Sequence, residues 1–182
     1  MTDRESSNIR RARIYSSAAD AGPLEENASK QEAGAPSRLG DGAFRWDGVD
    51  VLAYKDEGSA PFRAITRQVL FQRPELSCEL RYFEMAPGGH STFERHNHVH
   101  GVMIFRGRGL CLVGEEVREV AAPDLVFIPP MTWHQFRASA GEPFGFLCMV
   151  NAERDKPQLP TPEELAELQK NPAIAAFLAQ AD

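Results

Sequence analysis

The stretch of sequence that decides the fold is residues 88–107, which read GGHSTFERHNHVHGVMIFRG. It holds four of the five histidines of the chain, and the fifth, His134, lies beside Trp133. On an extended strand, residues two apart project to the same face. Four side chains of the stretch share such a face: Glu94, His96, His98 and His100. Because imidazoles and a carboxylate are costly to bury without partners, the pattern predicts a divalent metal site rather than a solvent-exposed polar strand.

Short apolar runs follow one another from Phe44 onward, and Gly, Pro or Asp separates them. The runs are residues 49–54, 64–71, 78–85, 99–105, 110–113, 116–120, 125–128 and 144–150. They are rich in Val, Phe and Leu, and turn signals such as Pro87-Gly88-Gly89 and Gly141-Glu142-Pro143 lie between them. Runs of this length and spacing predict an all-β sandwich or barrel.

Two segments of different character flank the predicted barrel, which we place at residues 44–152. Residues 1–43 are rich in Ser, Ala, Glu, Asn and Gly and predict a mobile N-terminal extension. Residues 153–182 predict a tail of short helices. The sequence Thr-Pro-Glu-Glu at 161–164 combines a capping threonine, a proline suited to the first helical position and a glutamate that completes a capping box.

The composition excludes some classes of protein and indicates a compartment. The 182 residues carry a net charge of −6, whereas a nucleic-acid-binding face needs an excess of basic residues, so no nucleic-acid partner is expected. Three cysteines without paired spacing indicate a reducing environment. No window is apolar enough for a membrane helix, and the N-terminus lacks the apolar region of a secretory signal. These observations predict a cytoplasmic protein with no membrane partner.

The histidine-rich stretch resembles the first sequence motif of the cupin superfamily, Gly-x5-His-x-His-x3-Glu-x6-Gly. Counting from Gly88 to Gly107, the spacing fits throughout. The residue types differ at two positions, because Glu94 stands where the family has its first His and His100 stands where it has Glu. The first and third ligand positions have thus exchanged residue types, while His96 matches the second His of the motif.

The second cupin motif, Gly-x5-Pro-x-Gly-x2-His-x3-Asn, is matched more loosely. Pro129 and His134 are in place, while Pro123, Met131 and Ala138 stand at the two glycines and the asparagine. Together the motifs imply a cupin-type double-stranded β-helix, or jelly-roll barrel, with a metal site of three histidines and one glutamate.

The resemblance covers about residues 45–152. It is most specific to small single-domain bacterial metal-binding cupins. In that group a histidine at the position of His100 is a ligand, and a cysteine follows the last ligand histidine by fourteen residues, as Cys148 follows His134 here. The resemblance thus implies a pocket role for the Cys148 thiol near the metal. The implied metal ligands are Glu94, His96, His100 and His134.

His98 is the alternative ligand. A regular strand would present His96 and His98 as a His-x-His pair. Counting back from Gly107 instead places His98 where the family usually makes a short turn, which favours His100 and leaves His98 as a pocket residue beside the ligands.

The function implied by the resemblance is oxidative chemistry on a small molecule. We expect a metal-dependent dioxygenase, because an open position on Fe(II) or Mn(II) can bind a substrate atom or dioxygen. Zinc, nickel and copper also accept these ligands. The alternatives are a non-redox cupin isomerase or lyase, and a non-catalytic cupin that binds a small molecule. The family further implies a homodimer.

Overall fold

The computed structural model describes residues 40–180, so nearly all of the predicted N-terminal extension lies outside the described residues. Within residues 40–180, nine β-strands precede two short α-helices. The strands are β1 (Leu52–Ala53), β2 (Arg63–Phe71), β3 (Cys78–His90), β4 (His100–Arg106), β5 (Arg108–Val113), β6 (Glu116–Ala121), β7 (Leu125–Ile128), β8 (His134–Ala138) and β9 (Phe144–Asn151). The helices are α1 (Pro162–Leu168) and α2 (Pro172–Ala179).

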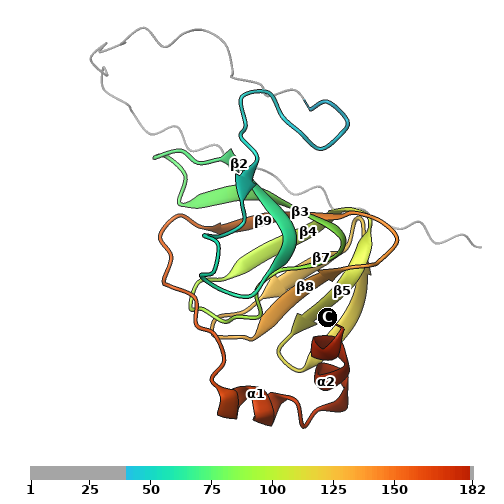
Figure 1. Ribbon diagram of the computed structural model, residues 1–182. Helices are drawn as coiled ribbons and strands as arrows, with labels where there is room; N and C mark the ends of the chain where they lie inside the picture. The colour runs from blue at the N-terminus through green and yellow to red at the C-terminus, as the bar shows by residue number, and fades with distance from the viewer. Residues whose placement is uncertain (1–39, 181–182) are drawn as a thin grey trace, which may run out of the picture. The chain divides into compact units, whose positions relative to one another are not determined.

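The strands form one curled antiparallel sheet, with the order β6-β5-β8-β3-β9-β4-β7. β2 pairs with β3, and β1 pairs with β2. Figure 1 shows the strands wrapping around a common interior, with the helices at one end. Alternate residues of the strands fill that interior, among them Met85, Ile104, Ile128, Phe144 and Phe146. The predicted all-β barrel with short C-terminal helices is confirmed.

One predicted turn, Pro87-Gly88-Gly89, lies inside the long strand β3. The pairing with β2 is irregular there, since Ile65 pairs with Met85 but Arg63 pairs with His90. A Cβ on Gly89 would lie 2.8–2.9 Å from three backbone carbonyl oxygens, so only glycine fits this bulge. The three residues therefore form a bulge near the end of the strand instead of the predicted turn.

Strand β8 is the element that the sequence patterns missed. All five of its residues, His134–Ala138, are buried, including Gln135 and Arg137. Arg137 donates two hydrogen bonds to the Gln135 side chain at 2.9 and 3.1 Å. Because these polar side chains satisfy one another inside the protein, the strand lacks the apolar alternation by which strands are found in a sequence.

The C-terminal helices begin as the sequence predicts. Thr161 caps α1, and its side chain and that of Glu164 form a complete capping box. Helix α2 buries Ile174 and Phe177, each only 1% exposed. They pack against barrel residues in a second apolar cluster, which also contains Phe93, Leu112 and Trp133. Because the cluster contains Trp133, it packs directly beside His134.

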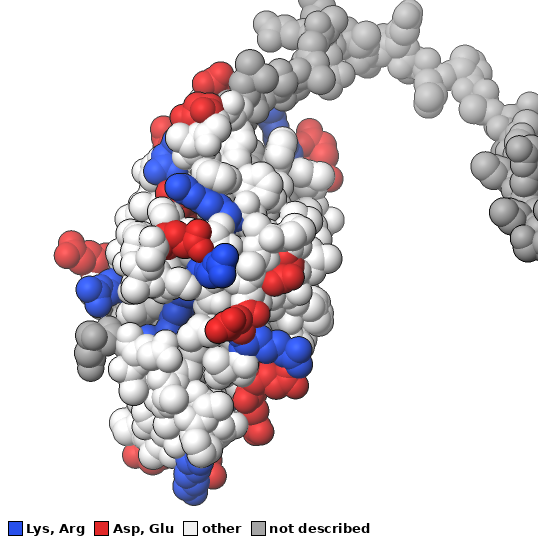
Figure 2. Space-filling model, turned by 90° about the vertical axis from the view of Figure 1, so that its right-hand side faces the viewer, with Lys and Arg blue, Asp and Glu red and all other residues white. Residues whose placement is uncertain are grey.

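No helix among residues 40–180 is long and apolar enough to span a membrane. The face of the protein in Figure 2 carries acidic and basic side chains side by side.

Candidate metal centre

Three histidines from different parts of the chain meet inside the barrel. His96 lies in the loop between β3 and β4, His100 begins β4, and His134 begins β8. Two backbone hydrogen bonds between Glu94 and His134, at 3.0 and 3.2 Å, join the loop to β8. The backbone therefore fixes the ligand loop against the strand that carries the distant histidine.

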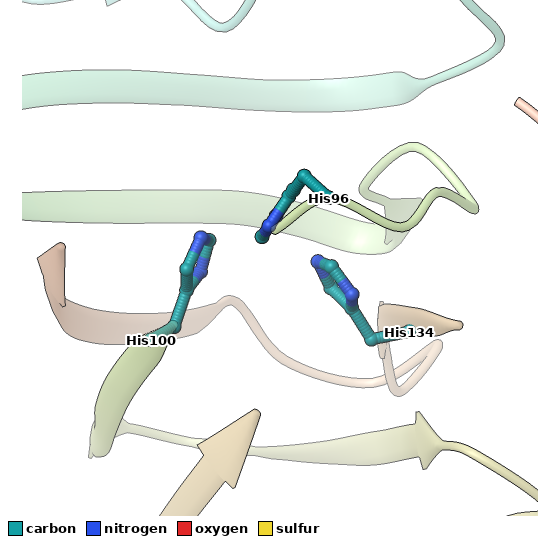
Figure 3. Close-up of side chains that lie close together, drawn as sticks. All are labelled: His96, His100 and His134. Carbon is teal, nitrogen blue, oxygen red and sulfur yellow. The ribbon is translucent and has the colours of Figure 1, made fainter. Parts of the chain in front are cut away.

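The rings of these three histidines point toward one another (Figure 3). One nitrogen of each ring lies within 4.8 Å of the corresponding atoms of the other two. The ring centroids of His96 and His100 are 4.6 Å apart, and those of His96 and His134 are 4.8 Å apart. Three imidazole nitrogens at this separation can share one metal ion.

The hydrogen bonds of the rings leave the lone pairs that a metal needs. Nδ1 of His96 lies 2.8 Å from the carbonyl oxygen of His98, and Nδ1 of His134 lies 2.9 Å from that of Thr132. A carbonyl only accepts, so both Nδ1 atoms donate and both Nε2 atoms keep a lone pair. The Nε2 atoms of His96 and His100 are buried without any hydrogen-bond partner. The residues therefore fit a metal ion, which would satisfy these atoms.

The electrostatics of the cluster keep the rings neutral. Burial, and then the neighbouring histidines, lower the pKa of His100 to about 2. Burial lowers the pKa of His134 to about 4, and the pKa of His96 is lowered for the same reason. A metal binds only neutral imidazole. At physiological pH these histidines are already neutral, so a metal can bind them without displacing a proton.

His98 is held in a different way from His100. Its ring stacks on His96 with a centroid distance of 3.6 Å and an interplanar angle of 6°. Its Nδ1 lies 2.6 Å from the Asp155 carboxylate, which also accepts from the backbone N–H groups of Asn97 and His98 at 2.8 and 3.0 Å. His96, His98 and Asp155 form a second possible cation group, whereas His100 groups with His96 and His134. Sequence reasoning missed Asp155, because it follows the last strand and no local spacing links it to His98.

Glu94 lies beside the centre but belongs to neither of the two groups found among the described residues. It is 6% exposed, and its carboxylate forms an ion pair with Lys55. Burial raises the pKa of Glu94, and the positive charge of Lys55 opposes that shift. Lys55 lies in a loop between β1 and β2, and no sequence motif marks it.

The Cys148 thiol lies at the edge of the histidine cluster. Its Sγ is 3.4 Å from Nδ1 of His100, and the residue is 2% exposed. Burial raises the pKa of the thiol to about 12, while the positive charges of Arg81 and Arg154 act in the opposite direction. Cys78 and Cys111 are also free thiols.

Comparisons with known proteins agree with this architecture. Residues 81–150 match the cupin domain family model. The chain is 64% identical to the 1-methylthio-D-xylulose 5-phosphate methylsulfurylase of Rhodospirillum rubrum over 143 residues, which are 79% of this chain and 92% of the relative.

Two solved structures are similar to the model. A cupin 2 conserved barrel domain protein from Rhodopseudomonas palustris matches with a TM-score of 0.74 and 60% identity, covering 78% of this chain and 98% of that one. A cupin-2 domain protein from R. rubrum matches with a TM-score of 0.72 and 64% identity, covering 76% and 93%. With a buried histidine cluster inside a jelly-roll barrel and relatives this similar over nearly their whole length, the chain belongs to the cupin family.

Proposed function

We propose that the protein is a metal-dependent enzyme that removes the methylsulfanyl group from a 1-methylthio ketopentose 5-phosphate. The observation that carries the proposal is the Cys148 thiol, 3.4 Å from a neutral, inward-facing histidine of the metal centre. It occurs in a chain 64% identical to a relative named for a methylsulfur transfer from such a sugar. A sulfur nucleophile and a metal side by side suit the cleavage of a carbon–sulfur bond next to a ketone.

The chemistry of that substrate class sets what the site must do. In a 1-methylthio 2-ketose, the sulfur is bonded to C1, and C1 is bonded to the carbonyl carbon C2. When a thiol sulfur bonds to the methylthio sulfur, the S–C1 bond breaks and its electron pair passes to C1 and the adjacent carbonyl. The thiol proton then ends on C1, giving a methyl disulfide and a 1-deoxy ketose phosphate. A bound divalent metal would supply a Lewis acid for the carbonyl group.

We assign the thiol that accepts the methylsulfanyl group to Cys148. Its side chain is enclosed by the barrel, which keeps water away from the reacting sulfur. A second, low-molecular-weight thiol would then release the methylsulfanyl group by disulfide exchange and return Cys148 to its reduced form.

For the metal we propose His96, His100 and His134 as ligands, with Glu94 as the fourth and His98 as the alternative. Neutral imidazoles and a carboxylate suit Fe(II) or Mn(II), and zinc, nickel and copper accept the same donors. Elemental analysis of the purified protein would identify the metal.

The experiment that tests the function is incubation of the metal-loaded protein with 1-methylthio-D-xylulose 5-phosphate and a small thiol. Mass spectrometry should find 1-deoxy-D-xylulose 5-phosphate and a mixed methyl disulfide, and Cys148→Ala should form neither. Protein without added thiol should retain one methylsulfanyl group, on the peptide that contains Cys148. An intact substrate after incubation with the metal-loaded protein would refute the proposal.

A dioxygenase remains the second candidate, because three histidines leave open positions on a metal where dioxygen could bind. Oxygen consumption in the same incubation separates the two functions, since the methylsulfanyl transfer uses none. Release of product without S–C cleavage or oxygen uptake would favour an isomerase or lyase. Binding without any turnover would favour a non-catalytic cupin.

We also propose that the protein is a cytoplasmic homodimer. Three free thiols suit a reducing compartment. Support for the dimer comes from the outer apolar face, which we define as Met103, Leu125, Phe127 and Met149 on strands β4, β7 and β9. Leu125 is 74% exposed and Phe127 is 63% exposed. The four side chains line one shallow apolar hollow, and contiguous exposed apolar surface of this kind marks interaction sites on soluble proteins.

A further inference from the structure

Three arginines lie together near the candidate metal centre, two of them on the inner side of the barrel wall and one at its edge. Arg67 is on β2, Arg81 is on β3, and Arg154 follows the end of β9. Arg67 pairs across the sheet with the buried Phe83, and Arg81 pairs with the buried Cys148. Because cross-strand partners project to the same face, both arginines face the interior rather than the solvent.

One carboxylate, that of Glu79, forms ion pairs with two of these arginines. Oε2 of Glu79, a residue that is 3% exposed, accepts from Nε of Arg81 at 2.8 Å and pairs with Arg154 at 3.0 Å. The Arg81 side chain is only 13% exposed, and that of Arg154 is 27% exposed. Three positive charges therefore gather around one negative charge in a place with limited access to water.

Arg67 is the member of the cluster with unmet hydrogen-bonding capacity. Its Nε atom is buried and has no hydrogen-bond partner. Burial lowers the pKa of the Arg67 guanidinium, and so do the positive charges of Arg81 and Arg154. A buried donor without an acceptor, beside more positive than negative charge, suits the binding of an anion with acceptor oxygens.

The cluster lies within reach of the metal centre. Glu79, which anchors it, is opposite Val150 on β9, and Val150 is opposite His100 on β4. Neighbouring strands are about 4.8 Å apart, so the backbones of Glu79 and His100, two strands apart, are separated by about 10 Å. Arg81 also contributes to the lowered pKa of His100. An anion held by the arginines would thus be separated from the metal by about the length of a small carbon chain.

Lys55 also lies near the centre, but it forms an ion pair with the Glu94 carboxylate. We propose that Arg67, Arg81 and Arg154 bind the phosphate monoester of the substrate, with Glu79 holding Arg81 and Arg154 in place. The identity of the ester rests on the proposed function, which puts the phosphate at the far end of a five-carbon chain from the ketone. Guanidinium groups bind phosphate oxygens through paired, charge-assisted hydrogen bonds.

The test measures binding and needs no turnover. The probes are D-xylulose 5-phosphate, inorganic phosphate and D-xylulose, titrated calorimetrically into the metal-loaded protein. We expect Arg67→Gln to weaken binding of D-xylulose 5-phosphate by about 10- to 100-fold, the effect of losing a charge-assisted hydrogen bond. Arg154→Gln, at the more exposed side of the cluster, should weaken it in the same direction. Both should retain wild-type metal content, and the preference for the phosphate ester over D-xylulose should fall.

The matched control is Arg108→Gln, because Arg108 is a 74% exposed arginine that pairs with Glu142 outside the cluster. It should bind all three probes as the wild type does. Wild-type affinity for D-xylulose 5-phosphate in both Arg67→Gln and Arg154→Gln would overturn the phosphate site, even if the enzyme cleaves the methylthio sugar. Conversely, arginine-dependent phosphate binding without any S–C cleavage would leave the site standing and refute only the proposed function.

Discussion

At the scale of single residues, the difference between His98 and His100 bears on which residues make up the candidate metal centre. The two residues are two positions apart in the sequence, with His98 in the loop before β4 and His100 at the first residue of that strand, and different partners hold them. The Asp155 carboxylate fixes the His98 ring, whereas the Nε2 atom of His100 is buried and has no partner. A ligand atom left without a hydrogen bond is the one that gains most from a metal.

Metal content should therefore respond differently to two substitutions. His100→Ala should weaken metal binding by more than about 100-fold, while His98→Ala, which removes a neighbour of the ligands, should weaken it by about 10-fold. Elemental analysis after dialysis against a graded chelator series would measure both. Full metal retention in His100→Ala, with loss in His98→Ala, would transfer the ligand role to His98.

The buried histidines should also make the metal-free protein sensitive to acid. Burial lowers the pKa of His134 from 6.5 to about 4, so between these pH values the unfolded chain binds a proton that the folded protein does not. Stability is then complete above pH 6.5 and falls as the pH decreases toward 4. Urea unfolding at about pH 7 and about pH 4.5 should show His134→Gln to be less acid-sensitive than the wild type by about 2–3 kcal/mol. An unchanged pH dependence in the variant would contradict this assignment.

At the scale of elements, helix α2 supports the strand that begins at His134. Its buried Ile174 and Phe177 pack in the same cluster as Trp133, which immediately precedes that histidine. Arg137 of β8 also lies over the ring of Phe177, 4.7 Å from its centroid. The C-terminal tail is thus part of the framework that positions the metal centre.

Truncating that contact should be costly. We expect Phe177→Ala to lower the free energy of unfolding by about 3–5 kcal/mol, since it removes a fully buried aromatic ring. Leu159→Ala is the control, because Leu159 is 43% exposed, and it should change stability by less than about 1 kcal/mol. Denaturant unfolding would measure both, from midpoints compared at the same dependence of the unfolding free energy on denaturant. Similar midpoints for the two variants would show that α2 contributes little to stability.

At the scale of the whole molecule, the outer apolar face predicts self-association. A lysine at position 125 or 127 in a dimer interface would bury an unpaired charge, so the double variant Leu125→Lys/Phe127→Lys should be monomeric. Sedimentation equilibrium would compare it with the wild type and with Leu159→Lys, a control at an exposed apolar residue outside the face. A wild-type protein that sediments as a monomer, or a double variant that remains a dimer, would exclude this face as the interface.

The sequence by itself determined the all-β barrel, the capped helix at Thr161 and the importance of the histidine stretch, because strand alternation, turn residues and caps act over a few neighbouring positions. Only the tertiary structure decided which histidines share a centre, that Glu94 pairs with Lys55, and that Asp155 holds His98. It also revealed β8 as a strand. It showed that Arg81 and Arg154 pair with Glu79 and that Arg67 lies near them. The physical reason is that these partners are far apart in the chain and meet only when the sheet closes, so no local pattern of residues records the contact.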